Sequence, residues 1–308
     1  MVKRRKISAP KKDDTKVAAI VVGLFAAAVI LFLVFSKAKE SPQRTTPVVR
    51  EPVEISTPIE KNEPVESSYV PRPVVSPEPV ENVSGSGGKI AIIIDDWGQT
   101  TANCKYLKEI PEPLAVSILP GLRHTKDVAN CAKLYHKLSM LHLPLEAMHN
   151  YDFYPPNYII KTSMDPALVS KIVDADLAQL PSIQGVNNHM GSKATADRAL
   201  MSIVFKRIRR KSLFFVDSMT SRYSISAKLA DEMGLAYGKR DVFLDNVNTR
   251  EAIVKQFVAL AQKARRRGYA VAIGHDRHLT MQVIKDEIPV LEKQGFEFVS
   301  IKELLKNK

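Results

Sequence analysis

Short apolar runs alternate with amphipathic stretches throughout residues 89–308, and this alternation constrains the fold more than any other feature of the chain. The apolar runs predict strands at 90–94, 114–119, 138–143, 185–187, 212–216, 270–273 and 297–300, with a less regular one at 241–244. Helical periodicity falls between them, at 100–108, 125–135, 166–179, 196–210, 225–233, 250–266 and 281–293. Such a pattern is typical of an α/β domain in which helices cover both faces of a parallel sheet, open or closed into a barrel. We favour a barrel of about seven strands, because polar residues follow so many separate strands.

The N-terminal part of the chain carries a second strong pattern. Residues 17–35 are nineteen residues without a charge, long enough for a helix that crosses a bilayer. A cleavable signal peptide is the alternative, but its apolar core is usually only about 7–15 residues long. We therefore expect an uncleaved, single-pass anchor in the cell (inner) membrane. The basic residues within 1–16 place that tail in the cytoplasm, so residues 89–308 are expected in the periplasm or outside the cell.

Residues 36–88 differ in composition from the rest of the chain. They hold nine of the nineteen prolines and end in Ser-Gly-Ser-Gly-Gly. Such a segment cannot bury enough apolar surface to offset the entropy lost on ordering, so we predict a disordered linker. The expected organisation is a cytoplasmic tail (1–16), a transmembrane helix (17–35), a linker (36–88) and one α/β domain (89–308).

The formal net charge of +12 permits an anionic partner, and two basic runs, 206–211 and 265–267, invite comparison with nucleic-acid-binding proteins. Both runs lie at the C-terminal ends of predicted helices, where cations complement the helix dipole. An extracytoplasmic location also excludes nucleic acid as a partner. The two cysteines, Cys104 and Cys131, are interpreted as core thiols, although an oxidising compartment would permit them to pair.

Polar side chains collect after the predicted strands. In parallel α/β folds, ligands bind beyond the carboxyl ends of the strands, so these side chains are the candidate site. They are Asp95, Asp96, His142, Glu146, Asn188, His189, Ser192, Asp217, Asp241, Asp245 and His275.

The pair Asp95-Asp96 comes directly after the apolar run Ile-Ala-Ile-Ile-Ile. Two adjacent carboxylates repel each other, and their desolvation is costly unless a cation or a proton resolves the conflict. Histidines at three other strand ends supply imidazoles, and imidazole with carboxylate is the ligand set of a hydrolytic zinc or similar divalent ion. One carboxylate of the pair would bind the ion, and the other would accept a proton from the water that the ion holds.

Six segments occur in a fixed order over nearly all of residues 89–308: IAIIIDDWG, LHLPLE, GVNNHMGS, FFVDS, RDVFLDN and AIGH. Together they resemble the divergent polysaccharide deacetylases, relatives of the chitooligosaccharide and peptidoglycan deacetylases of carbohydrate esterase family four. The resemblance implies a distorted (β/α) barrel and metal-dependent N-deacetylase chemistry. It also implies that Asp95 is the general base, Asp96 a carboxylate ligand and His275 the general acid.

Two departures from the better-studied relatives affect the expected site. Trp97 stands where those relatives have glycine after the acid pair, and Glu146 stands at the second position of their His-x-x-x-His segment. We therefore expect His142 and His189 to complete the ligand set with Asp96, leaving Glu146 as an alternate ligand or a support for one.

The remaining polar residues have two interpretations each. Asn188, Ser192 and Trp97 are candidate substrate contacts, with Asn188 a possible donor to the oxyanion; turn formation, helix capping and core packing are the alternatives. Asp217 is the expected partner that orients His275, with Asp241 and Asp245 as other candidates. Asp217 can also form a turn, and Asp241 can pair with Arg240 as a structural ion pair.

The sequence thus predicts a membrane-anchored, extracytoplasmic, metal-dependent hydrolase. Its expected cofactor is a divalent metal, Zn²⁺ before others, and its expected substrate an N-acetylated polysaccharide of the cell envelope or the exterior. The alternative is a domain that has lost turnover and acts as a tethered glycan-binding or scaffold protein. A phosphotransfer aspartate would need a phosphate-binding loop or a lysine after a late strand, and neither is found in the sequence.

Overall fold

The computed structural model describes residues 87–149 and 158–306. The predicted cytoplasmic tail, the predicted membrane helix and nearly all of the predicted linker lie outside the described residues. Among the helices of the described part, none combines the length and the apolar character that crossing a membrane requires.

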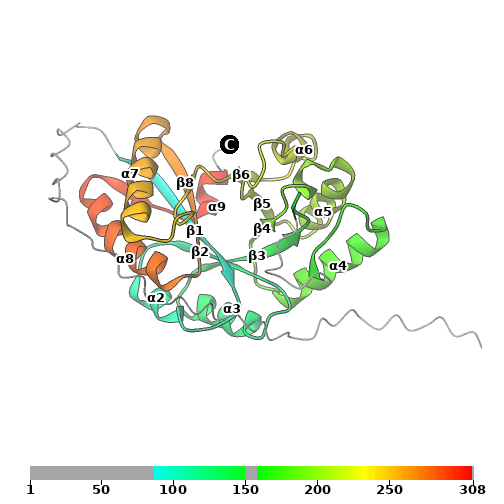
Figure 1. Ribbon diagram of the computed structural model, residues 1–308, viewed down its shortest axis with the longest axis horizontal. Helices are drawn as coiled ribbons and strands as arrows, with labels where there is room; N and C mark the ends of the chain where they lie inside the picture. The colour runs from blue at the N-terminus through cyan, green and yellow to red at the C-terminus, as the bar shows by residue number, and fades with distance from the viewer. Residues whose placement is uncertain (1–86, 150–157, 307–308) are drawn as a thin grey trace, which may run out of the picture. The chain divides into compact units, whose positions relative to one another are not determined.

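Nine parallel strands form one sheet (Figure 1). They are β1 (Gly88–Trp97), β2 (Leu114–Ile118), β3 (Leu138–Leu145), β4 (Gly185–Met190), β5 (Phe214–Asp217), β6 (Tyr237–Lys239), β7 (Val242–Phe243), β8 (Tyr269–His275) and β9 (Phe296–Phe298). Eight of them run in the order β6-β5-β4-β3-β2-β1-β8-β7, and β9 pairs with the start of β1. The predicted parallel α/β sheet is confirmed. It curls into a half-barrel, since the described residues show no ladder between β6 and β7.

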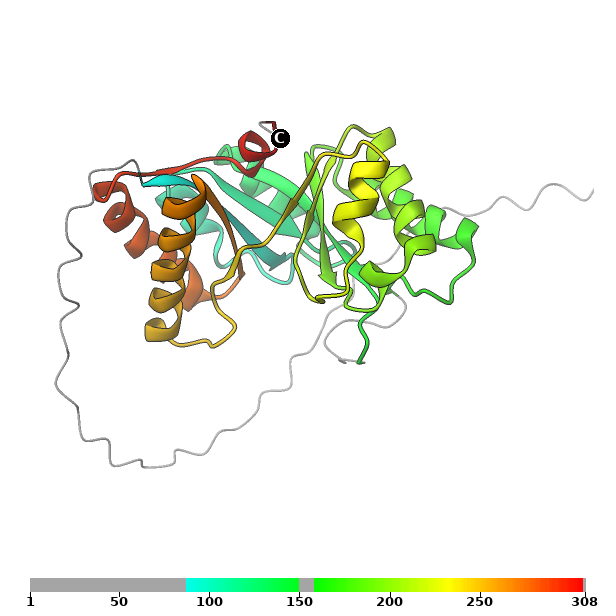
Figure 2. The same ribbon diagram turned by 90° about the horizontal axis from the view of Figure 1, so that it is seen from above.

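Helices connect the strands, and most of them line the outside of the curled sheet, while the last one covers part of its inner face (Figures 1 and 2). They are α2 (Cys104–Glu109), α3 (Thr125–Leu134), α4 (Pro166–Gln179), α5 (Arg198–Arg210), α6 (Ser226–Glu232), α7 (Arg250–Arg267), α8 (His278–Lys293) and α9 (Ile301–Lys306), with a 3-10 turn at Ala194–Ala196. Local chemistry fixes several ends: the Asp165 carboxylate accepts from the first amides of α4, and Gly268, with φ +79°, ends α7 in the left-handed conformation.

The two faces of β1 pack into different cores. Ile90, Ile92 and Ile94 face the helices, within the larger apolar cluster. Ala91 and Ile93 face the inside of the curl, within a second cluster that helix α9 helps to cover. Because side chains alternate along a strand, the next inward position after residues 91 and 93 is Asp95. The concave face therefore changes from apolar to polar at the carboxyl end of β1.

A disulfide joins Cys104, at the start of α2, to Cys131 in α3. Their Cα atoms are 6.1 Å apart across a sequence separation of 27 residues. The interpretation of the two residues as core thiols was therefore wrong. The sequence shows both on separate helices but not that α2 and α3 pack against each other over neighbouring strands.

Candidate metal centre

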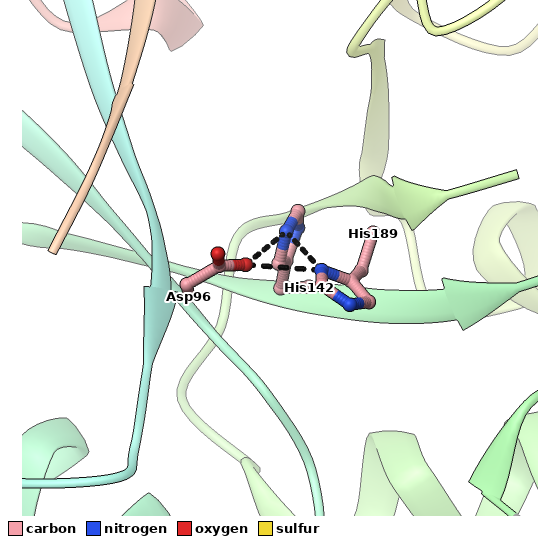
Figure 3. Close-up of side chains that lie close together, drawn as sticks. All are labelled: Asp96, His142 and His189. Atoms are coloured by element: carbon pink, nitrogen blue, oxygen red, sulfur yellow. Dashed lines mark hydrogen bonds and ion pairs between the residues drawn. The ribbon is translucent and has the colours of Figure 1, made fainter. Parts of the chain in front are cut away.

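Asp96, His142 and His189 converge at the carboxyl ends of β1, β3 and β4 (Figure 3). Asp96 Oδ1 lies 3.0 Å from His189 Nδ1 and 3.2 Å from His142 Nε2, and the two nitrogens are 3.3 Å apart. The structure thus brings together the three residues that the sequence analysis proposed as ligands. They come from three strands of one parallel sheet, with β3 and β4 adjacent and β2 between β1 and β3.

An irregularity in β1 turns Asp96 toward this cluster. The pairing register between β1 and β2 shifts between Ile94 and Trp97, and Asp96 adopts a left-handed backbone with φ +65°. In an unbroken strand Asp96 would share the helix-facing side with Ile92 and Ile94. The bulge breaks that alternation, so Trp97 takes the core position instead. A non-glycine residue in this conformation costs about 1–3 kcal/mol, which the surrounding fold must offset.

The orientation of His142 follows from its other ring nitrogen. This side chain is almost fully buried, and Nδ1 lies 2.8 Å from the Asn187 side-chain oxygen. Because that oxygen is an acceptor, Nδ1 carries a hydrogen, and Nε2 is the ring nitrogen that faces Asp96 and His189. A neutral imidazole in this tautomer is ready to bind a cation.

Charges within the cluster stabilise one another. The surrounding protein opposes ionisation of Asp96, but hydrogen bonds from His142 and His189 outweigh that effect and hold the pKa of Asp96 well below its usual range. Burial also disfavours the charged form of His142, yet Asp95 and Asp96 together raise its pKa. The cluster thus forms around a fixed negative charge.

Asp95 lies beside the cluster without joining it. Its Oδ1 accepts a hydrogen bond of 2.7 Å from the Asn187 amide, and its Oδ2 lies 3.6 Å from His142 Nε2. The side chain is only 3% exposed, and burial raises the pKa of Asp95. The two neighbouring carboxylates therefore differ: Asp96 holds its charge firmly, and Asp95 takes up a proton more readily.

His275 lies on β8, where it is the strand-pairing partner of Asp95 on β1. Its Nδ1 lies 2.9 Å from Asp245 Oδ1, and its Nε2 lies 3.8 Å from Asp96 Oδ2. The second Asp245 oxygen accepts from the His275 backbone amide and from the Thr280 hydroxyl. Burial works against the imidazolium, but the Asp245 hydrogen bond and the nearby carboxylates raise the pKa of His275. Asp245 therefore orients this imidazole and favours its protonated form.

The donor set and its spacing fit a divalent ion. Zinc binds imidazole nitrogen and carboxylate oxygen at about 2.0–2.2 Å, which separates neighbouring ligands of a tetrahedron by about 3.3 Å. The three donor atoms here are 3.0–3.3 Å apart. Two imidazoles and one carboxylate suit zinc and similar transition metals better than calcium or magnesium, and they leave coordination positions open.

Three acidic residues do not act where the sequence analysis placed them. Asp217 accepts from the Met219 amide and the Ser224 hydroxyl, so Asp245, and not Asp217, is the acid on His275. Glu146 is held by Thr162 and Lys193 instead of joining the ligands. Asp241 pairs with an arginine of α7, at the amino end of β7, because β7 begins only at Val242.

Two of the three predicted substrate contacts, Trp97 and Asn188, are buried in the fold. Trp97 is fully buried in the helix-facing core. Asn188 is 1% exposed; its side chain accepts from the Ser218 amide, directly after β5, and donates to the Met190 carbonyl at the end of β4. Ser192 accepts from the Met148 amide. Trp97 and Asn188 thus take the structural roles that the sequence left open for them, while the half-buried Ser192 stays a predicted substrate contact.

Arg240 also departs from the predicted pairing with its neighbour Asp241. Its guanidinium donates to the carbonyls of Ser218 and Met219 and stacks on the Phe243 ring, 4.4 Å from the ring centroid. Burial lowers its pKa, while the charges of Asp95 and Asp217 counteract that effect. Arg240 therefore brings a positive charge near the buried Asp95.

Asn187 was not expected among the metal ligands or the catalytic residues, although it contacts both His142 and Asp95. The available signal was its position two residues before His189. Alternate residues of a strand share a face, so Asn187 would point to the same side of the sheet as that histidine.

A cavity of about 880 Å³ lies elsewhere, at the amino ends of β2, β3 and β4. Leu114, Leu138 and Gln184 line it at the starts of those strands, and its charged lining is basic, with Lys126 and Lys133 from α3 and Lys137. The donor cluster is at the opposite, carboxyl ends of the same strands. This cavity is therefore separate from the candidate metal centre.

The fold and the cluster define a class: parallel α/β proteins that gather an Asp-His-His set at the carboxyl ends of their strands. Within that class, residues 92–305 match the family described as divergent polysaccharide deacetylase, and the chain belongs to this family.

Two relatives and one solved structure illustrate the similarity. The uncharacterised Escherichia coli protein YibQ is 30% identical over 201 residues, which are 65% of this chain and 62% of YibQ. An uncharacterised Haemophilus influenzae protein is 32% identical over 197 residues, 64% of this chain and 70% of that protein. The structure of an uncharacterised Agrobacterium tumefaciens protein superposes with a TM-score of 0.67 at 20% identity, covering 72% of this chain and 90% of the other. This last similarity shows the fold alone.

Proposed function

We propose that this protein is a metal-dependent hydrolase that removes N-acetyl groups from a polysaccharide of the cell envelope or the exterior. The observation that carries the proposal is the Asp96-His142-His189 cluster, with the buried carboxylate Asp95 and the oriented imidazole His275 both beside it. Family membership supports the class of substrate.

Asp96, His142 and His189 would hold the ion. When bound, a divalent metal such as Zn²⁺ polarises a carbonyl oxygen and lowers the pKa of a water molecule. Asp95 would accept a proton from the attacking water, since burial raises the pKa of Asp95 toward the range in which a carboxylate acts as a general base. The Asn187 amide holds the Asp95 carboxylate in place for this step.

His275 is placed to donate a proton to the departing amine. The Asp245 carboxylate fixes the hydrogen on Nδ1, so that Nε2, on the side facing Asp96, carries the proton that is transferred. Breaking an amide requires such a donor, because the amine leaves readily only after it is protonated. Asp95 and His275 would thus act as the base and the acid of one hydrolysis.

The proposal extends to location. Residues 17–35 would anchor the chain in the cell (inner) membrane, and residues 36–88 would tether the catalytic domain on the extracytoplasmic side. The Cys104–Cys131 disulfide supports this side of the membrane, because disulfides persist in oxidising compartments.

Metal analysis and acetate release on the full chain test the function together. We expect about one ion per chain after reloading with Zn²⁺, loss of the ion in His189→Ala, and retention in His136→Asn, which removes an exposed histidine away from the site. Acetate release from N-acetylglucosamine oligomers should occur in the proteins that bind the ion and be lost in His189→Ala.

Two results would contradict the proposal in different ways. If His189→Ala kept the ion, the ligand set would be wrong. If the wild-type chain bound the ion but released no acetate from any N-acetylated glycan, the tethered glycan-binding protein would replace the hydrolase.

A further inference from the structure

Asn187 lies between the ligand His142 and the carboxylate Asp95, on strand β4 (Gly185–Met190). Its side chain is fully buried. A buried amide has two donor hydrogens and an acceptor oxygen with two lone pairs, and each unsatisfied group costs free energy. The partners of this amide therefore reveal its role.

The Asn187 side chain uses its whole capacity. Its oxygen accepts from the Ser117 hydroxyl and from His142 Nδ1, the latter at 2.8 Å. Its nitrogen donates to Asp95 Oδ1 at 2.7 Å and to the Ser218 hydroxyl at 3.3 Å. The oxygen side of the amide thus faces the metal ligand, and the nitrogen side faces the general base.

Only one orientation of this amide is compatible with its surroundings. If oxygen and nitrogen exchanged places, the oxygen would face the Asp95 carboxylate at hydrogen-bonding distance, and two acceptors repel each other. In the observed orientation the oxygen faces His142, so Nδ1 of that ring must carry the hydrogen. The Asp95 carboxylate thereby sets the amide orientation, and the amide sets the tautomer of the ligand.

We infer that Asn187 is a positioning residue that couples the two halves of the site. It holds His142 in the tautomer that offers Nε2 to a metal ion, and it holds Asp95 at the distance needed to accept a proton. The inference rests on the proposed function, because it assigns Asn187 a role in that same site. It adds a residue that acts through its neighbours and touches neither metal nor substrate.

Two substitutions separate the two contacts. Asn187→Leu introduces a side chain of similar size and removes the hydrogen bonds to His142 and to Asp95 together. Asn187→Asp keeps an oxygen for His142 Nδ1 but replaces the donor toward Asp95 with a second acceptor. Ser218→Ala is the matched control, because it removes only the longer contact of the same amide. Circular dichroism and thermal unfolding of each full-length variant check the fold.

Metal affinity, measured by competition with a chelating dye for Zn²⁺, is the first readout. We expect Asn187→Leu to bind Zn²⁺ about 10–100-fold more weakly, the usual loss when the partner of a ligating histidine is removed. Asn187→Asp should bind at least as tightly as the wild type, because a carboxylate also accepts from Nδ1, yet its turnover should fall since Asp95 is no longer held. Ser218→Ala should match the wild type in both properties.

The tautomer of His142 is the second readout, and it needs neither metal nor activity. Nitrogen-15 NMR of the metal-free chain, at a pH where the imidazole is neutral, should show hydrogen on Nδ1 in the wild type and in Asn187→Asp. Asn187→Leu should show a mixture of tautomers. A residue that merely filled space would leave this ratio unchanged.

The outcomes distinguish this inference from the proposed function. Wild-type affinity and tautomer in Asn187→Leu would overturn the inference even if the chain is an active deacetylase. Equal loss of affinity in Asn187→Asp and Asn187→Leu would overturn the role of the oxygen as acceptor. If the wild type bound no metal, the proposed function would fail, while the tautomer measurement would still decide whether Asn187 orients His142.

Discussion

Carboxylates at the site differ in their surroundings. Asp96 faces two imidazoles and keeps its charge, whereas Asp276, directly after His275, receives a single hydrogen bond, of 2.7 Å, from the Asn103 amide. Burial and the nearby charge of Asp96 raise the pKa of Asp276 to about 6, against the weaker effect of Asn103. Ionised Asp276 therefore destabilises the folded state, because an unfolded chain solvates that charge fully.

Asp276→Asn should stabilise the metal-free protein at neutral pH. The pKa of Asp276 rises from an ordinary 3.8 to about 6 on folding, so the folded state binds the proton more tightly and loses stability as pH increases between those values. Asparagine keeps an acceptor for Asn103 and carries no charge. The gain should approach about 3 kcal/mol above pH 7 and vanish near pH 3.5. Urea unfolding of the wild type and of Asp276→Asn at the two pH values measures this gain. A chelator keeps both proteins free of metal.

An equal difference between the two chains at both pH values would contradict the assignment, since only ionisation makes the effect depend on pH. Asp231→Asn is a suitable control, because it removes an exposed carboxylate of helix α6.

Residues that act through charge were recognisable from the sequence, while their partners were not. Asp96, His142 and His189 come after apolar runs, and the parallel fold gathers the side chains at the ends of such runs. Which acid orients His275 depends on how far β7 and β8 extend beside each other. The choice of Asp245 over Asp217 is a matter of tertiary packing, which a single sequence does not display.

At the scale of elements, β4 shows where local pattern fails. The sequence predicted a strand at 185–187, because the polar residues Asn187, Asn188 and His189 interrupt the apolar run. The strand continues to Met190, paired with β3 throughout. Its buried polar groups are satisfied by neighbouring strands and loops, so tertiary contacts overrode the pattern. Strand β6 and helix α9 were missed because both are short, and β6 offers no apolar run.

Gly185, the first residue of β4, is predicted to be intolerant of a side chain. An added Cβ would overlap the ring of Phe214, which belongs to the adjacent strand β5. Gly185→Ala should lower the free energy of unfolding by about 1–3 kcal/mol, the usual cost of overpacking. Because β4 also carries His189, we expect Zn²⁺ binding to weaken with it. Chemical denaturation and dye competition measure the two effects.

A double substitution tests the cause. Gly185→Ala combined with Phe214→Leu should be less destabilised than the sum of the two single variants, because the smaller side chain makes room for the methyl group. Strict additivity would show that the ring is not what excludes a side chain at Gly185.

At the scale of the whole domain, a parallel sheet with covered faces was predictable because its strands are apolar on both sides. The open edge between β6 and β7 was not, since closure depends on strand tilt and stagger that sequence periodicity does not encode. The disulfide between α2 and α3 likewise required knowledge of which helices are neighbours. It ties together the connections after β1 and β2.

Loss of this disulfide should lower the free energy of unfolding while leaving the affinity for metal nearly unchanged. Cross-linking residues 27 apart restricts the unfolded chain, a contribution of about 2–4 kcal/mol, whereas Asp96, His142 and His189 are held by strands that the bond does not join. We expect Cys104→Ser with Cys131→Ser to unfold at lower urea and to keep near wild-type affinity for Zn²⁺. Reduction of the wild-type chain should reproduce the lower midpoint, and reduction of the double variant should change nothing.

Native wild-type protein, exported from the cytoplasm and assayed without reductant, should show no reactive thiol. Thiols that react under those conditions would contradict the disulfide, and they would also remove the argument that it provides for an oxidising, extracytoplasmic location.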